Sequence, residues 1–195
     1  KPSQSSYGYK HLHAPGSESR KSTRSSARQA PVPAVLVGLC AHGLACARAL
    51  SRSGVPVYAL EANPRLPGCR TRHAHVTFTD DINGPGLIKG LQKLAQTEFP
   101  DIQPVLILTN DNMVREVGEN WTALERQYRL SWHSTRERVL QMLTKTYIER
   151  TCRSAGLYYP QTFYISDADT CLNGIANGVE FPLLIKPSRP LSGFK

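Results

Sequence analysis

A buried strand that runs directly into a helix, near residue 34, constrains the fold more than any other feature of the sequence. The run AVLVGL (34–39) is short, apolar and β-branched, which is typical of a strand buried on both faces. Gly43, Ala47 and Leu50 then follow at helical spacing, and Gly54 supplies a stop signal. This succession predicts an α/β sheet covered by helices.

The same alternation continues to about residue 133. Further strands are predicted over residues 55–61, 74–78 and 104–109, with a helix over 86–97 between the last two. Another helix follows the last strand, with its apolar stripe at a spacing of three to four residues. This order predicts an open, mostly parallel, doubly wound sheet of the Rossmann-like kind, whose ligands bind beyond the carboxyl ends of the strands.

The alternation of strands and helices ends after residue 133. Residues 134–156 predict a long helical stretch, as one helix or two, that begins at a cap formed by Ser134 or Thr135, with Glu137 three residues after Ser134 as in a capping box, and ends at Gly156. Beyond it, the sequence predicts a strand, a short helix and a closing strand, over residues 162–166, 168–176 and 182–186.

These patterns predict three parts. Residues 1–32 form a tail, residues 33–133 form the Rossmann-like domain, and residues 134–195 form a helical connector with the opening of a second domain.

The net charge of +9 is concentrated in the tail. Residues 1–30 hold six basic residues against one acid, which leaves a net charge of +4 for the rest of the chain. With eight serines and few large apolar side chains, this segment is predicted to be disordered, although its composition also resembles an organelle transit peptide. Because most of the excess charge lies in the tail, we do not expect a nucleic acid as partner.

The sequence shows no hydrophobic stretch of the ~20 residues that cross a bilayer, and no signal-peptide segment. Five cysteines lie at scattered positions without a C-x-x-C pair, which favours reduced thiols over disulfides or a zinc site. We therefore expect a soluble, cytoplasmic protein that does not bind a membrane. Whether it forms a homodimer stays open.

The segment GLCAHG (38–43) lies where the first strand is expected to meet its helix. Gly38 and Gly43 occupy the outer positions of a G-x-G-x-x-G dinucleotide motif, but Cys40 stands in the middle. Glu61 ends the second strand, where such folds place a ribose-binding acid. Two interpretations stay open: dinucleotide binding, or a tight strand-to-helix turn.

Three polar residues near the same edge are candidates for substrate contact. His42 lies in the first loop, and Asn110 and Asp111 follow the last strand of the predicted sheet. Asn and Asp are also preferred helix caps, so a purely structural role stays open for both residues.

Lys145 and Lys186 form a candidate phosphate-binding pair. Lys145 stands off the apolar stripe of its helix, and Lys186 ends a predicted strand just before Pro187. An ammonium group is a compact charge that satisfies phosphate oxygens without fixed geometry, so two lysines directed at one cleft suit a polyphosphate. Two solvated lysines are the alternative.

The segment LTKTYIERTCRSAGLYYPQTFYIS (143–166), followed by GVEFPLLIKPS (178–188), resembles the entry to the ATP-grasp fold. TNDNMVREVGENWTALERQYRL (109–130) is similar to the carboxylate–amine ligase-like branch of that superfamily, and the upstream sheet resembles its pre-ATP-grasp domain. The resemblance implies that residues 134–195 are a helical connector and the incomplete start of the α+β nucleotide-binding ATP-grasp domain. The resemblance implies that Lys145 and Lys186 contact ATP phosphates, under a closing loop that contains Ser188, Ser192 and Gly193.

The resemblance also implies an ATP-dependent ligase that activates a small-molecule carboxylate as an acyl phosphate, which an amine or a thiol then displaces. In that family, the magnesium ligands lie downstream of the phosphate loop, so we expect this chain alone not to catalyse ligation. Two other hypotheses stay open: an NAD(P)-binding Rossmann oxidoreductase, and a non-catalytic binding or regulatory module.

Overall fold

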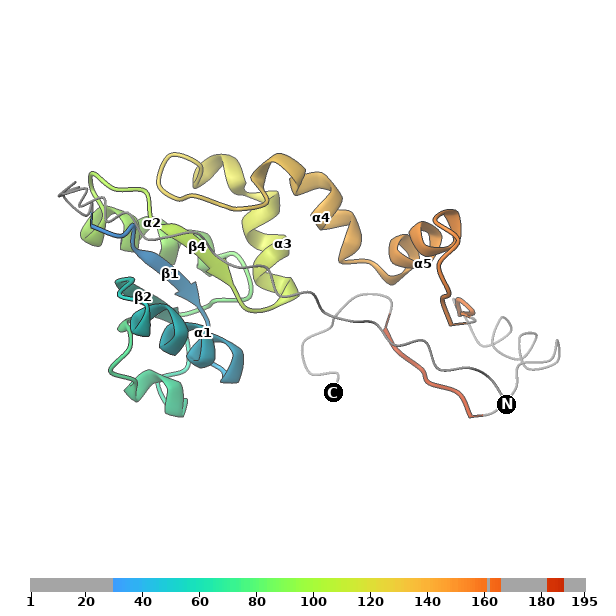
Figure 1. Cartoon of the computed structure of the whole chain (residues 1–195), viewed down its shortest axis with the longest axis horizontal. Helices are drawn as coiled ribbons and strands as arrows, with labels where there is room; N and C mark the ends of the chain where they lie inside the picture. The colour runs from blue at the N-terminus through green and yellow to red at the C-terminus, as the bar shows by residue number, and fades with distance from the viewer. Residues whose placement is uncertain (1–29, 161, 166–181, 188–195) are drawn as a thin grey trace, which may run out of the picture. The chain divides into compact units, whose positions relative to one another are not determined.

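The computed structural model describes residues 30–160, 162–165 and 182–187 (Figure 1). The chain divides into two units, residues 1–30 and 31–195, and every described helix and strand belongs to the second unit. In chain order, the strands, α-helices and short 3-10 helices are β1 (Ala34–Val37), α1 (Ala41–Arg52), β2 (Val57–Glu61), η1 (Pro67–Arg70), β3 (His75–Phe78), α2 (Gly86–Glu98), β4 (Val105–Leu108), α3 (Asp111–Glu119), η2 (Trp121–Ala123), η3 (His133–Thr135), α4 (Arg136–Met142) and α5 (Lys145–Ser154).

β1 is an inner strand of a four-stranded, all-parallel sheet with the order β3-β2-β1-β4. Ala34 lies opposite Val57 of β2 on one side and opposite Val105 of β4 on the other. β3 pairs along the outer side of β2. The chain therefore moves outward from β1 to β3 and then returns to the other side of β1 to form β4. This arrangement confirms the predicted α/β, Rossmann-like class.

Helices cover both faces of the sheet, with α1 on one side of β1 and with α2 and α3 on the other (Figure 1). Because alternate residues of a strand point to opposite faces, Val35 and Val37 pack in one cluster with residues of α2 and α3. Leu36 packs instead with Ala47 of α1. All three β1 side chains are fully buried. Burial on both faces explains why the sequence of β1 is continuously apolar.

The apolar stripe predicted for α3 is confirmed, and α2 also buries one side. Leu87 and Leu91 of α2 are fully buried, as are Met113 and Val117 of α3. The second stripe extends beyond its helix, because α3 ends at Glu119 while Trp121, in η2, is still buried.

The turn from β1 into α1 leaves no room for side chains at its glycines. Gly38 has a φ of +86°, a conformation that residues with a Cβ rarely adopt. A Cβ on Gly43 would lie 1.9 Å from the carbonyl oxygen of Gly38, and a Cβ on Gly68 would lie 2.1 Å from that of Leu39. The first turn of α1 and the helix η1 therefore lie against this backbone at a separation that only glycine allows.

The predicted helical stretch after residue 133 divides into two helices, α4 and α5, and Gly156 follows α5 with a φ of +66°. The predicted capping box is wrong. Ser134 lies inside η3, and α4 begins after Thr135, whose hydroxyl donates a hydrogen bond to the carbonyl oxygen of Trp132 (3.3 Å). A serine inside a helical turn cannot adopt the extended backbone of an N-cap.

In the part of the chain that the structure describes, no apolar residue after Leu130 is buried. Residues 162–165 and 182–187 form no strand, so the strands predicted over 162–166 and 182–186 are wrong for their described residues. The helix predicted over 168–176 lies outside the described residues. An apolar run becomes a strand only where a neighbouring strand pairs with its N–H and C=O groups, and none of the four described strands pairs with these runs.

Among the described residues, no helix has the length and apolar character needed to cross a bilayer. The four cysteines in this part of the chain, Cys40, Cys46, Cys69 and Cys152, form no disulfide with one another. Cys171 lies outside the described residues.

The packing of the turn predicts that Gly43→Ala destabilises the protein by more than about 2 kcal/mol, because the methyl group meets a backbone carbonyl that cannot move without displacing β1. Without that contact, Ala inside a helix would stabilise by up to about 1 kcal/mol relative to Gly. Urea denaturation followed by circular dichroism measures the loss.

Gly54→Ala is the matched control for this variant. Gly54 has a φ of +78°, but no atom lies within 4 Å of an added Cβ. Only backbone strain then acts, and we expect a cost of about 1–2 kcal/mol. A smaller loss for Gly43→Ala than for Gly54→Ala would contradict the close packing of the turn.

Candidate functional site

The carboxyl edge of the sheet holds most of the predicted site residues. The strand order reverses between β1 and β4, and ligands of open parallel sheets bind at such a point. Thr109 follows β4 and donates a hydrogen bond from Oγ1 to the carbonyl oxygen of Val37, the last residue of β1 (2.7 Å). A Cβ on Gly38 would lie 2.6 Å from that hydroxyl oxygen. The structure therefore brings the glycine turn and the start of α3 together.

The carboxylate of Glu61 is turned into the protein. Glu61 is 2 % exposed, and its Oε2 accepts a hydrogen bond from the backbone N–H of Leu39 (2.6 Å). Its Oε1 accepts hydrogen bonds from the backbone N–H groups of Ala62 (2.8 Å) and Asn63 (3.1 Å). Backbone donors thus engage both oxygens, and the carboxylate joins the loops after β1 and β2. This geometry favours a role in the turn over a contact with a ribose.

Asn110 is the N-cap of α3. Its Oδ1 accepts a hydrogen bond from the backbone N–H of Met113 (3.0 Å), and its Nδ2 donates one to Oδ1 of Asn83 (2.8 Å). Asp111 is exposed in the first turn, where its negative charge complements the helix dipole. Capping therefore accounts for Asn110, and the Asn83 contact ties α3 to the loop before α2.

Cys40 and His42 give the turn a thiol with acidic character, which the sequence interpretation missed. Both residues are exposed, and the Sγ of Cys40 lies 3.7 Å from the Nδ1 of His42. Burial raises the pKa of the Cys40 thiol, but hydrogen bonds from the backbone of Gly43 and from His42 have the larger combined effect and lower it. The sequence feature that indicates this thiol is a cysteine at the start of a helix with a histidine two residues later.

The two predicted phosphate-binding lysines meet through the backbone of Pro187. Lys145 is the first residue of α5, and its Nζ donates a hydrogen bond to the carbonyl oxygen of Pro187, the residue after Lys186. Lys145 is half-buried and Lys186 is exposed. The side chain of Lys145 therefore lies at the chain segment that carries Lys186, although 42 positions separate it from Pro187.

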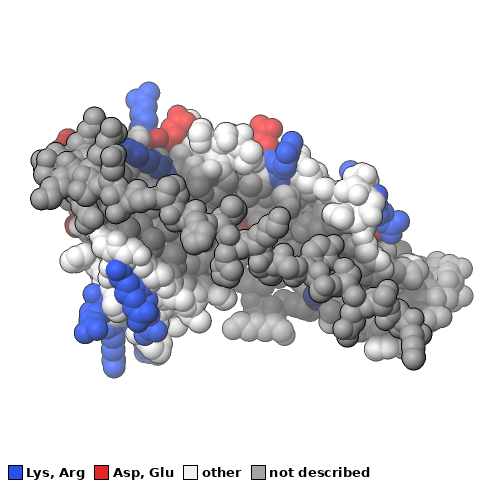
Figure 2. Space-filling model, viewed as in Figure 1, with Lys and Arg blue, Asp and Glu red and all other residues white. Residues whose placement is uncertain are grey.

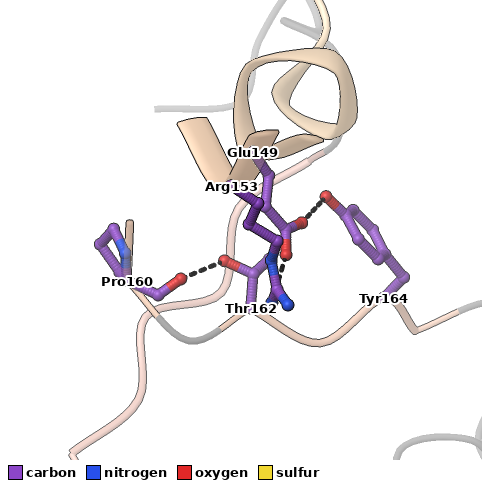
Figure 3. Close-up of polar contacts among 5 residues, drawn as sticks. All are labelled: Glu149, Arg153, Pro160, Thr162 and Tyr164. Carbon is purple, nitrogen blue, oxygen red and sulfur yellow. Dashed lines mark hydrogen bonds and ion pairs between the residues drawn. The ribbon is translucent and has the colours of Figure 1, made fainter. Parts of the chain in front are cut away.

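A buried carboxylate holds the segment 162–165 on α5 (Figure 3). Glu149 is 7 % exposed, its Oε2 accepts a hydrogen bond from the hydroxyl of Tyr164 (2.5 Å), and its Oε1 pairs with Arg153 (2.7 Å). The Tyr164 hydroxyl, and then the Arg153 guanidinium, hold the pKa of Glu149 below its ordinary value against the opposing effect of burial. The same hydrogen bond raises the pKa of Tyr164 to about 12.

The remaining predicted residues and the hollows of the surface add no contact to the sites described above. Ser188, Ser192 and Gly193, predicted to belong to the phosphate loop, lie outside the described residues. Two hollows, of about 450 and 620 Å³, contain none of the predicted site residues. Among the described residues, no group of three or more His, Cys, Asp and Glu side chains could hold a metal ion.

The carboxylate of Glu61 and the three backbone N–H groups that it binds are called the clamp below. We predict that Glu61→Gln lowers the free energy of unfolding by about 2–3 kcal/mol. A glutamine offers one acceptor oxygen in place of two, so its NH₂ group would face a backbone N–H. Glu119→Gln, at an exposed position of α3, is the control and should change stability by less than about 0.5 kcal/mol. Urea denaturation of both variants measures the difference, and equal losses would show that the clamp contributes little.

The Glu149–Tyr164 hydrogen bond predicts that Glu149→Gln returns the pKa of Tyr164 from about 12 toward its ordinary value of 10.0. Because folding raises this pKa and lowers that of Glu149, the contact stabilises the fold fully between pH 4.5, the ordinary pKa of Glu149, and pH 10, and the stabilisation is lost as the pH rises toward 12. The ¹³Cζ chemical shift of Tyr164, followed by NMR through a pH titration, reports the change.

Tyr128 is the internal reference for this titration, because burial rather than a carboxylate raises its pKa. Its titration should be the same in both proteins. An unchanged Tyr164 titration in Glu149→Gln would mean that the two side chains do not interact in solution.

No protein-family model matches the sequence, and a search of curated proteins finds no match. Any function assigned to the chain therefore depends on its own side chains and on their geometry.

Proposed function

We propose that this chain binds the phosphates of ATP through Lys145 and Lys186, as part of an ATP-dependent carboxylate–amine or carboxylate–thiol ligase. The hydrogen bond from Lys145 to the carbonyl oxygen of Pro187 carries the proposal, because it links the start of α5 to the segment that holds Lys186. The sequence resemblance to the ATP-grasp entry depends on the same two lysines.

The chemistry of the pair suits a polyphosphate. An ammonium group has three N–H donors, so Lys145 keeps two after its bond to the carbonyl oxygen. Lys186 is exposed and free to turn toward a ligand. No described carboxylate lies within ion-pairing distance, 4.0 Å, of either ammonium group. Both charges therefore stay available for phosphate oxygens, which bind lysine as a point charge.

The proposed reaction proceeds through an acyl phosphate. A carboxylate oxygen of the substrate attacks the γ-phosphorus of ATP, and the bond to the bridging oxygen breaks to release ADP. The amine or thiol then attacks the acyl carbon, loses its proton and displaces inorganic phosphate. The lysines would bind and orient the phosphates, and a magnesium ion, when bound, would neutralise the charge that develops on them.

The dinucleotide hypothesis has less support. Its ribose-binding acid, Glu61, already accepts three backbone hydrogen bonds. The backbone N–H groups of Gly38 and Leu39 are also engaged, with Leu60 and Glu61 respectively, so they are not free to bind a pyrophosphate.

Isothermal titration calorimetry with ATP tests the lysine pair. Lys145→Gln and Lys186→Gln should each weaken ATP binding at least about tenfold, since a hydrogen bond to a charged group contributes about 1.5–3 kcal/mol. Lys89→Gln is the matched control, because Lys89 is an exposed lysine of α2, and it should leave the affinity unchanged.

The same titration separates the hypotheses. Equal ATP affinity in the native protein and in Lys186→Gln would contradict the proposal. Binding of NADH without binding of ATP would favour the dinucleotide hypothesis instead.

A further inference from the structure

The sequence around α1, η1 and β3 is strongly basic. Residues 40–79 contain five arginines and a single acid, Glu61, whereas residues 80–195 contain thirteen basic and thirteen acidic residues. The whole excess of positive charge that lies outside residues 1–30 therefore comes from this one stretch.

The five arginines reach the surface. Arg48 and Arg52 of α1, Arg65, Arg70 of η1 and Arg72 are all exposed. The single acid of the stretch is buried, so it does not face them. Within the described part of the chain, no carboxylate lies within ion-pairing distance of these guanidinium groups. The stretch thus presents positive charge without compensating negative charge, which we call the arginine face.

Tertiary contacts bring the arginines together from different elements. Arg48 and Arg52 are four residues apart on α1, so they lie on one side of that helix. The Nδ1 of His73 lies 3.2 Å from the Oγ of Ser51, which holds the stretch around Arg72 beside the last turn of α1. The helix η1, which ends at Arg70, packs against α1.

The space-filling view supports a concentrated positive surface. Figure 2 shows Lys and Arg side chains gathered at the lower left, over the part of the chain where Figure 1 labels α1 and β2, with no acidic side chain among them. Acidic side chains are visible along the upper side of the view, where Lys and Arg side chains lie next to them.

Like charges held on one face repel one another, and binding a polyanion relieves that repulsion. All five cations are arginines, and no lysine occurs between residues 31 and 88. The guanidinium group binds phosphate through two parallel hydrogen bonds and stacks on aromatic rings, which a lysine does not do.

A bilayer surface fits the face less well than a nucleic acid does. Among the large hydrophobic residues of this stretch, which the structure describes throughout, only Phe78 is strongly exposed, at 51 %, and one such residue gives little insertion into lipid. The ring of Phe78 lies on the same face of β3 as Val76, which packs with the α1 cluster, and it instead suits stacking against an unpaired base.

We propose that the arginine face binds the phosphodiester backbone of a single-stranded nucleic acid, with little dependence on base sequence. This surface is separate from the lysine pair, and the proposal departs from our expectation that a nucleic acid is not a partner. That expectation considered how much charge lies in the tail, but not how the remaining charge is arranged.

Fluorescence anisotropy with a labelled, mixed-sequence single-stranded RNA or DNA tests this proposal on the full chain. The quadruple variant Arg48→Gln, Arg52→Gln, Arg70→Gln and Arg72→Gln should bind at least about tenfold more weakly at 100 mM salt. The slope of log K against log salt should fall by about 3, since each lost phosphate contact on a single strand removes about 0.7.

The matched control removes four exposed charges elsewhere, with Lys89→Gln, Lys93→Gln, Arg126→Gln and Arg129→Gln. It should keep most of the affinity and of the salt slope. Both quadruple variants keep the basic tail, so the tail cannot account for a difference between them. Circular dichroism verifies folding, and the double variant Arg48→Gln, Arg52→Gln, with about half the change in slope, serves if the quadruple variant unfolds.

Three outcomes would overturn the proposal. Equal losses in the two quadruple variants would mean that only total charge matters, and no loss in either would assign the binding to another part of the chain. Arginine-dependent binding to phosphatidylserine vesicles, without binding to the oligonucleotide, would identify a membrane surface instead. Because Lys145 and Lys186 are unchanged in every variant, ATP binding is tested independently.

Discussion

The contact between Gly43 and the carbonyl oxygen of Gly38 determines how the rest of the domain is assembled. An added Cβ would lie 1.9 Å from that oxygen, so the first turn of α1 lies directly on the end of β1. Leu39 follows Gly38, and its backbone N–H is bound by the buried carboxylate of Glu61. The same turn therefore positions α1 on the sheet, joins β1 to β2 and provides the carbonyl against which η1 packs.

Two kinds of interaction stabilise the described parts of the chain. The sheet and its helices bury apolar side chains on both faces, whereas the described residues after Leu130 bury only one side chain, the carboxylate of Glu149. Apolar burial contributes in proportion to area, but a hydrogen-bonded ion pair contributes little once solvent competes for its charges. We therefore expect α5 and segment 162–165 to separate from each other at a lower free energy than the sheet unfolds.

The two proposed binding surfaces use different cations for different phosphate ligands. A lysine pair next to a backbone carbonyl suits the terminal phosphates of a nucleotide, because an ammonium group adapts to phosphates that change during a reaction. Arginines spread over a helix, a 3-10 helix and a loop suit a phosphate chain of regular spacing, which rigid guanidinium groups can bind side by side. A ligase and a nucleic-acid-binding surface are compatible because no residue is shared between them.

The amino-acid sequence by itself determined the elements and the class of the fold: the continuous apolar run of β1, the helical stripes and the cap Asn110 follow from local periodicity and side-chain chemistry. The tertiary structure alone decided the strand order, the inward turn of Glu61, the absence of strands at residues 162–165 and 182–187, and the gathering of the arginines on one face. These features depend on contacts between residues far apart in the chain. A pattern of neighbouring residues encodes which groups need partners, but it does not encode which distant partners they meet.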